Sequence, residues 1–142
     1  MDIDDVTLLY RVRKTVHQML KDRGYIVRED RIKESKQDFA TWYEGKAKKR
    51  DALNMMVEKR RDHADASEFA VEEESQKMIV FFPDVEKLNM ADLRQIALKM
   101  IEINCFNSIV VVKSASLVSA KVSLGRIRSY FFLERITNYL TS

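Results

Sequence analysis

Two histidines, one cysteine and three glycines are the first residues in this sequence to test for metal or nucleotide chemistry. His17 and His63 stand far apart and Cys105 is distant from both, so the ligand spacing of a zinc site is missing. The glycines are isolated and form no phosphate-cradling loop. We therefore expect no metal and no cofactor. His17 should flank one face of a helix, and Cys105 should be a small buried apolar residue at a helix end.

A second group of residues could contact phosphate. Lys113 follows a predicted strand, and Lys121 lies in a short helix that we expect from about Ser116 to Leu124, closed by Gly125. Free backbone N–H groups at a helix start favour phosphate, and the two lysines would add positive charge. Such contacts carry no base code, so binding would be independent of sequence. The alternative is an ordinary turn with solvated lysines.

Aromatic side chains offer a third possibility. Phe39, Trp42 and Tyr43 could stack against bases, but their place on a capped helix favours a role in the hydrophobic core. The basic stripe that includes Arg11 and Lys14 on the first helix is typical of a solvated face.

The composition indicates one folded domain. The chain has 142 residues, of which 46% are hydrophobic and 33% charged, with a net charge of +3. This mild positive charge permits contact with nucleic acid without requiring it. A single cysteine agrees with a reducing compartment. The acidic start lacks the pattern of a signal peptide, and no apolar run approaches the roughly 20 residues of a membrane span, so we expect no membrane partner.

Hydrophobic periodicity and capping residues predict three longer helices. The first should run from about Ile3 to Arg23, with acidic residues at its start and Gly24 at its end. Ser35 with Asp38 resembles a capping box and should begin a helix that ends at Gly45. The third helix should start at Asn89 and end near Asn104. Its predicted inward stripe is Met90, Leu93, Ala97, Met100 and Ile101.

The strands should lie at residues 53–57, 78–82, 108–112 and 130–133, with a short extended piece at 25–27. The runs at 78–82 and 108–112 are apolar throughout, which suits strands buried on both faces. Joined by a helix, they form a parallel βαβ unit. The fold class is therefore α/β, as a three-layer α/β/α domain with a mixed sheet of about four or five strands. The polar stretch at 58–77 should be a long exposed connection.

Three segments resemble a known family. Residues 11–15 read Arg-Val-Arg-Lys-Thr and lead to Asp-Arg-Gly-Tyr at 22–25. Residues 80–83 read Val-Phe-Phe-Pro, and residues 119–124 read Ser-Ala-Lys-Val-Ser-Leu. In order and spacing, these segments are similar to the N-terminal jaw domain of the fifth subunit shared by the eukaryotic nuclear RNA polymerases I, II and III.

The resemblance implies a restriction-endonuclease-like fold and a non-catalytic role in transcription, in the nucleus. It implies a place in the jaw around downstream double-stranded DNA, held against the largest polymerase subunit and other subunits, with general transcription factors as further partners. The DNA-facing turn would include Lys113, Ser116, Ser119, Ala120 and Lys121.

The sequence departs from the family in two informative places. Leu117-Val118 stands where the family has Thr-Pro, which alters the DNA-facing turn. The chain stops at Thr141-Ser142, where the family continues into a C-terminal assembly domain. We therefore expect residues 1–142 to be a single N-terminal jaw domain. It is either a fragment of a longer protein or a relative that lost the C-terminal half, and we favour the fragment.

A restriction-endonuclease-like fold raises the possibility of nuclease activity. Such activity needs an Asp on one strand and a Glu/Asp-x-Lys pattern on the next, so that carboxylates surround Mg²⁺ beside a lysine. Asp51 could supply the first carboxylate, but the strand at 78–82 offers neither a carboxylate nor a lysine. The patterns at 34–36 and 83–87 fall outside the strands. We therefore expect no catalysis.

Two alternatives to a polymerase role remain open at this point. One is a stand-alone nucleic-acid-binding or nuclease-derived domain, which would bind DNA appreciably by itself. The other is a docking scaffold for transcription factors that does not touch DNA.

Overall fold

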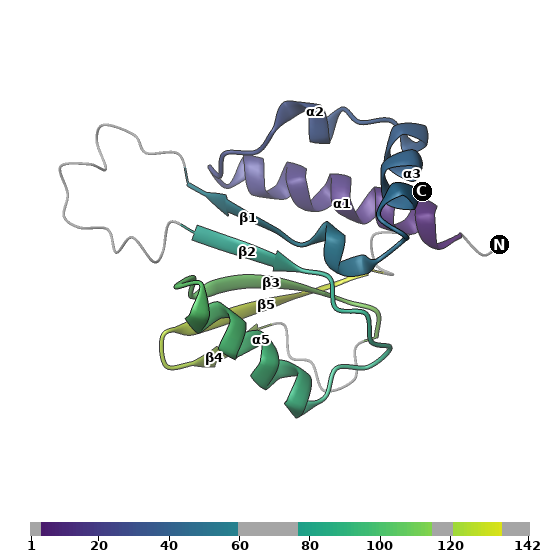
Figure 1. Cartoon of the computed structure of the whole chain (residues 1–142). Helices are drawn as coiled ribbons and strands as arrows, with labels where there is room; N and C mark the ends of the chain where they lie inside the picture. Colours follow the sequence, from purple (N-terminus) through teal and green to yellow (C-terminus); the bar gives the residue numbers. More distant parts are fainter. Residues whose placement is uncertain (1–3, 60–76, 115–120, 135–142) are drawn as a thin grey trace.

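The computed structural model describes residues 4–59, 77–114 and 121–134. Within them, five strands form one mixed sheet in the order β1-β2-β3-β5-β4 (Figure 1). β2, β3 and β5 run parallel, and the antiparallel strands β1 and β4 form the two edges. The bounds are β1 (Met55–Glu58), β2 (Lys77–Phe81), β3 (Asn107–Val112), β4 (Lys121–Leu124) and β5 (Ile127–Leu133).

The three longer helices, α1, α3 and α5, each begin at a residue whose side chain caps the helix. Asp4 accepts a hydrogen bond from the backbone N–H of Thr7 (2.7 Å), and Ser35 accepts one from Asp38 (3.1 Å). Asn89 and Asp92 form a reciprocal capping box. The bounds are α1 (Asp5–Asp22), α2 (Glu29–Ile32), α3 (Lys36–Gly45), the 3₁₀ helix η1 (Arg50–Leu53) and α5 (Met90–Glu102).

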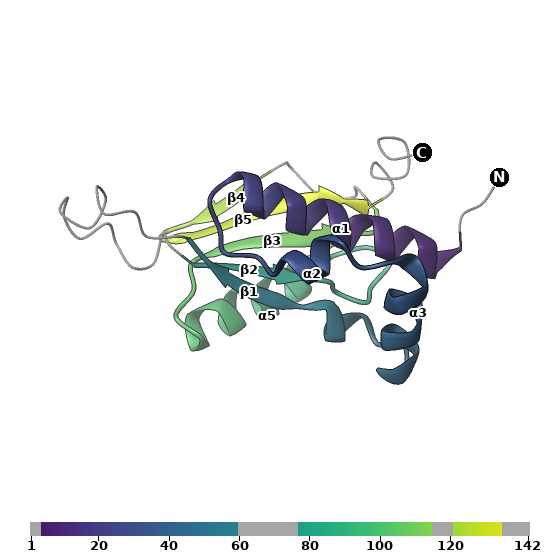
Figure 2. The same ribbon diagram turned by 90° about the horizontal axis from the view of Figure 1, so that it is seen from above.

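One face of the sheet is covered by α1, α2 and α3 (Figures 1 and 2). Val12, Val16 and Leu20 of α1 are fully buried in a core that also holds Phe39 and Tyr43 of α3. The strand side chains in this core come from alternating positions of β2 and β3 and from the residue that follows β2: Met78, Val80, Phe82, Ile109 and Val111. This face therefore holds the larger of the two cores.

The opposite face is covered by α5. Its core takes the remaining strand positions, Ile79 and Phe81 of β2 with Val110 and Val112 of β3, and adds Met100 of α5. Both central strands are therefore buried on both faces, as their continuous apolar runs predict. The three-layer arrangement, the parallel βαβ unit and the strand number are confirmed.

The α5 stripe differs from the prediction at both ends. Met90 and Ile101 were expected to face inward, but they are 57% and 54% exposed. Leu93, Ile96 and Met100 make the contact with the core. The helix is rotated so that this row, rather than the one through Met90, faces the sheet.

The predicted helix from Ser116 to Leu124 is wrong over its second half, where residues 121–124 form β4. These four residues alternate polar and apolar, which is the period of a strand. Gly125, with φ of +60°, is the first residue of a two-residue turn between Leu124 and Ile127. Such turns require a positive φ at this position. The glycine that suggested a helix end is therefore a hairpin glycine.

Two smaller differences concern strand ends. Leu53 closes η1 rather than opening a strand, although it shares a core with Met55 and Val57 as the alternation predicts. The extended piece at 25–27 contributes only an isolated bridge between Tyr25 and Lys59.

The prediction of an exposed connection at 58–77 falls largely outside the described residues. None of the described helices is long and apolar enough to cross a membrane.

Candidate nucleic-acid interface

The carboxyl ends of β2, β3 and β5 meet at one edge of the sheet, because the three strands are parallel and in register. Pro83 lies just beyond β2, Lys113 directly follows β3 and Glu134 directly follows β5. This edge of a parallel sheet is where α/β proteins usually place their ligand sites. The sequence-predicted phosphate contact Lys113 therefore lies at a favourable place in the fold.

Lys113 is already engaged in an ion pair. Its Nζ lies 3.1 Å from Oδ1 of Asp84, in the loop that follows β2. The Lys113 side chain is 24% exposed and the Asp84 side chain 73% exposed. A partly exposed pair of this kind contributes little stability. A phosphate near Lys113 would have to compete with the Asp84 carboxylate.

The buried side chain of Arg50 links the segments that follow β2 and β5 at this edge. Its Nε donates to the carbonyl oxygen of Pro83 (3.1 Å), and its Nη1 pairs with Oε2 of Glu134 (3.0 Å). Both partners of the ion pair are more than nine-tenths buried. Since Pro83 follows β2 and Glu134 follows β5, Arg50 fixes the two strand ends relative to each other. Sequence alone gives no sign of this pair, because its members are 84 residues apart.

A cleft of about 500 Å³ opens beside this edge. Its charged lining is balanced, with three cationic and three acidic side chains: Lys48, Arg50, Lys113, Asp4, Asp5 and Asp84. A phosphate would meet both signs of charge here. The cleft is therefore not the dense basic surface of a dedicated nucleic-acid binder.

The other predicted site residues are not gathered with Lys113. Ser116, Ser119 and Ala120 lie outside the described residues. Lys121 begins the edge strand β4 opposite Tyr130, which itself pairs with Ile109 of β3. Lys121 is therefore two strands across and about four residues back from Lys113, on the order of 15 Å away at ordinary strand spacings. The helix start expected near Ser116 lies outside the described residues, and Lys121 lies in a strand rather than in that helix.

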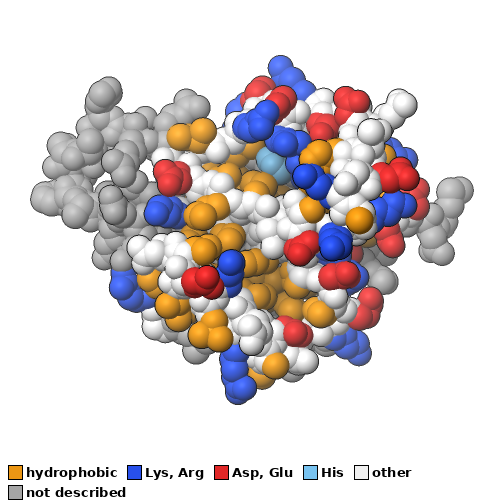
Figure 3. All heavy atoms as spheres, in the orientation of Figure 1, with side chains coloured by type: hydrophobic (Ala, Val, Ile, Leu, Met, Phe, Trp, Pro, Cys, Tyr) orange, Lys and Arg blue, Asp and Glu red, His pale blue; other side chains and the backbone are white. Residues whose placement is uncertain are grey.

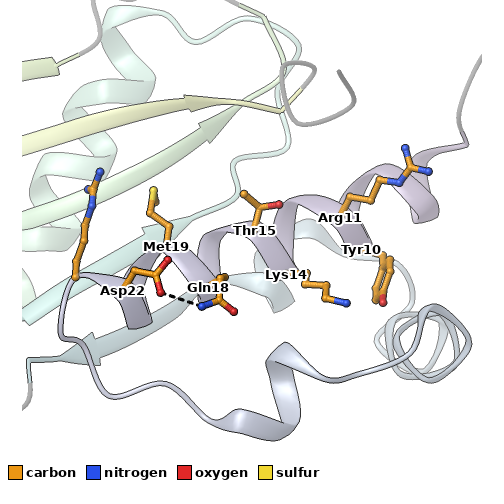
Figure 4. A pocket seen from close by; sticks show the side chains of 8 residues that line it. Tyr10, Arg11, Lys14, Thr15, Gln18, Met19 and Asp22 are labelled. Carbon is orange, nitrogen blue, oxygen red and sulfur yellow. Dashed lines mark hydrogen bonds between the residues drawn. The ribbon is translucent and has the colours of Figure 1, made fainter. Parts of the chain in front are cut away.

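A groove with basic residues lies on the outer side of α1. A groove of about 750 Å³ is lined by Tyr10, Arg11, Lys14, Thr15, Met19 and Arg23, among others (Figure 4). Gln18 donates to Asp22 along its side (2.9 Å). The basic stripe expected to be solvated therefore forms part of a groove.

The aromatic residues of α3 belong to the core rather than to a stacking platform. Phe39 is fully buried and Tyr43 is 3% exposed, and their rings stack at 5.6 Å. Trp42 is half-buried, with the guanidinium of Arg13 4.4 Å from its ring centre. Arg13 in turn pairs with Glu34 (3.2 Å). The interpretation as core is confirmed.

Comparison with known proteins identifies the family. Residues 4–100 match the family model described as RNA polymerase Rpb5, N-terminal domain. The chain belongs to this family.

Individual relatives of this Rpb5 family extend the likeness over most of the chain. The chain is 33% identical over 130 residues to "DNA-directed RNA polymerases I, II, and III subunit RPABC1" of Caenorhabditis elegans. This alignment covers 89% of the chain and 56% of the relative. The chain is 27% identical over 134 residues to "DNA-directed RNA polymerase subunit 5-like protein 1" of Arabidopsis thaliana, covering 92% and 59%. The chain thus spans less than two thirds of the length of these curated relatives.

Some of the candidate residues lie within the region that the Rpb5 family model matches, and others lie beyond it. Residues 4–100 contain α1, the apolar strand β2, the Asp84 loop and most of α5. Lys113 and β4 lie beyond the region that the family model matches. The family assignment therefore rests on the helical layers and β2, and the proposed phosphate contacts need their own test.

In the part of this Rpb5-type domain that the structure describes, residues that could catalyse a reaction do not gather at one place. Asp51 is exposed on η1, and β2 beside it is apolar from Met78 to Phe81. Among the described residues, no three His, Cys, Asp or Glu side chains group so as to hold a metal ion. Burial raises the pKa of the Cys105 thiol above its ordinary value, which lowers the share of reactive thiolate.

Proposed function

We propose that this chain is a non-catalytic domain of a subunit of the nuclear DNA-directed RNA polymerases, and that it forms part of the jaw near downstream DNA. The observation that carries the proposal is the match of residues 4–100 to the Rpb5 N-terminal domain. The identity of 33% to a subunit named for polymerases I, II and III supports it across 89% of the chain. The proposed partners are the largest subunit, other polymerase subunits and general transcription factors, and the proposed location is the nucleus.

The non-catalytic part of the proposal is supported by β2. In a nuclease of this architecture, this strand would carry a carboxylate and a lysine beside a metal ion. Here its positions 78–81 are buried apolar side chains that pack on both faces of the sheet. A functional metal site would require buried charge in place of this packing.

The proposed DNA contact is weak and electrostatic. Lys113 lies at the carboxyl edge of the parallel strands, and contact with one or two phosphates would give a shallow salt dependence, with a log–log slope of about −1 to −2. The Asp84 carboxylate, 3.1 Å from Lys113 Nζ, reduces the availability of the lysine. The domain alone should therefore bind DNA weakly, and the assembled polymerase would supply the affinity.

The polymerase role is tested by co-purification. We expect a tagged full chain to recover subunits of polymerases I, II and III from nuclear extract. A tagged chain that recovers no polymerase subunit would contradict the proposal.

The DNA contact is tested by two substitutions with opposite expected effects. In the assembled polymerase, Lys113→Gln should weaken crosslinking to downstream DNA, because a phosphate contact is lost. Asp84→Asn should strengthen it, because Lys113 is released. Lys33→Gln, at an exposed lysine after α2, is the matched control and should change nothing. If Lys113→Gln and Asp84→Asn change crosslinking in the same direction, or neither differs from the control, the contact lies elsewhere.

A further inference from the structure

Helix α5 carries two apolar stripes, and only one of them is used within the described fold. Leu93, Ile96 and Met100 pack onto the sheet. Met90, Leu98 and Ile101 are 57%, 60% and 54% exposed. Their spacing places them along one flank of the helix, beside the buried row.

This flank is an exposed surface that folding does not explain. Leu98 and Ile101 could be polar at no cost to the core, because their side chains lie mostly in solvent. In Figure 3, apolar side chains continue from the strands at the near edge of the sheet onto the region of α5. Exposed apolar side chains gathered on one flank of a helix mark an interaction site more often than apolar residues scattered singly over a surface.

A basic residue stands in the middle of the flank. Arg94 occupies the helical turn between Met90 and Leu98 and is exposed. No carboxylate among the described residues forms an ion pair with Arg94, and the Asp92 carboxylate is engaged in the capping box. We call Met90, Arg94, Leu98 and Ile101 the outer α5 stripe. Its chemical complement is a segment with apolar side chains around one carboxylate.

We propose that the outer α5 stripe docks an amphipathic helical segment of a partner protein, with apolar side chains on Met90, Leu98 and Ile101 and a carboxylate paired with Arg94. The stripe is about 17 Å long at the helical rise of 1.5 Å per residue. That length suits three turns of a helix laid against α5. The contact adds a protein-docking surface to the polymerase role and does not depend on it.

Other occupants fit the stripe less well. A second copy of this chain would present the same four side chains, which include no carboxylate, and would bury Arg94 without a partner. Nucleic acid would meet three apolar side chains and a single cation, whereas phosphate binding needs several cations.

Photo-crosslinking from the helix tests the proposal directly. A tagged full chain carries p-benzoylphenylalanine at position 98, on the stripe, or at position 99, where exposed Lys99 lies a quarter-turn further round. After irradiation in cells, the crosslinked peptides are mapped by mass spectrometry. We expect at least about tenfold more crosslinked product from position 98 than from position 99. The product should map to one partner segment that has apolar residues at helical spacing and an acidic residue among them.

A charge exchange completes the test. Arg94→Glu should lower the yield from position 98 about tenfold, which is the effect of about 1.4 kcal/mol, and a Lys in place of the mapped partner carboxylate should restore it. Equal yields from positions 98 and 99, products with a second copy of this chain or with nucleic acid, or a yield that ignores Arg94→Glu would overturn the proposal. The readout is the mapped partner segment, so the docking proposal can fail while polymerase subunits still co-purify, and it can hold when they do not.

Discussion

The two faces of the sheet are closed to different degrees. On the α1 side, three helices cover the strands and are tied to one another by side chains: Tyr10 donates to the carbonyl of Glu34 (2.9 Å), and Arg13 pairs with the Glu34 carboxylate (3.2 Å). On the other side, α5 is the one helix among the described residues, and Met100 is its one buried residue. Three of its apolar side chains remain mostly exposed.

This difference separates residues that serve folding from residues that serve contact. The α1 side, covered by three interlocked helices, buries its main apolar side chains within the domain. A face covered by one helix with a spare apolar stripe has apolar surface left over. The proposed protein-docking surface therefore lies on the α5 side, and the proposed DNA contact lies at the carboxyl edge with Lys113.

The largest expected effects lie in the sheet, and they test whether both faces are truly packed. Ile109→Ala removes a side chain from the α1 side and Phe81→Ala one from the α5 side. Each should lower the free energy of unfolding by about 2–5 kcal/mol, through lost burial and the cavity left behind. Urea denaturation measures this. A loss below about 1 kcal/mol for Phe81→Ala alone would show that the α5 side is not a packed core.

A smaller, pH-dependent effect on the free energy of unfolding should arise on the α1 side of the sheet. His17 is 5% exposed in α1, and burial lowers its pKa below the ordinary value, with the nearby Arg13 charge acting in the same direction. The unfolded chain then binds more protons than the folded one, so the stabilisation is complete above about pH 6.5 and is lost as the pH falls below that value.

The pH effect is measured as the free energy of unfolding between pH 7.5 and 5.5. The fall should be steeper in the native sequence than in His17→Gln, which cannot take up the proton. Parallel profiles for the two proteins would mean that His17 is solvated and that the α1 side is more open than described.

The smallest expected effect is on the outer α5 stripe. Leu98→Ala should change the free energy of unfolding by no more than about 0.5 kcal/mol, because the side chain is already exposed. Met100→Ala, two residues along the same helix, is the matched control and should cost about 2–5 kcal/mol. If Leu98→Ala is as costly as Met100→Ala, the stripe belongs to the core and the contrast between the two faces disappears.

Much of this fold could be predicted because its main elements carry strong local signals. Long periodic stripes and capping residues gave α1, α3 and α5, and two unbroken apolar runs gave β2 and β3. The strand β4 was missed because four residues are too short to establish a period, and Gly125 is as compatible with a helix end as with a hairpin turn. Which row of α5 faces the sheet also could not be predicted, since the helix offers two apolar rows.

The candidate site was less predictable, because its chemistry depends on pairs distant in sequence. Lys113 could be selected for its charge and its place after a strand. Its partner Asp84 is 29 residues earlier, in a loop segment considered only for its resemblance to a nuclease pattern. The Arg50–Glu134 pair joins elements that only the closed sheet brings together. Local sequence carries no signal for either contact.

The most direct test of the polymerase role is a structure of the assembly purified through this chain, with downstream duplex bound. We expect the domain to be held by other polymerase subunits, with the carboxyl edge of β2 and β3 toward the duplex and Lys113 within contact distance of a phosphate. A structure in which that edge faces away from the DNA would contradict the placement in the jaw.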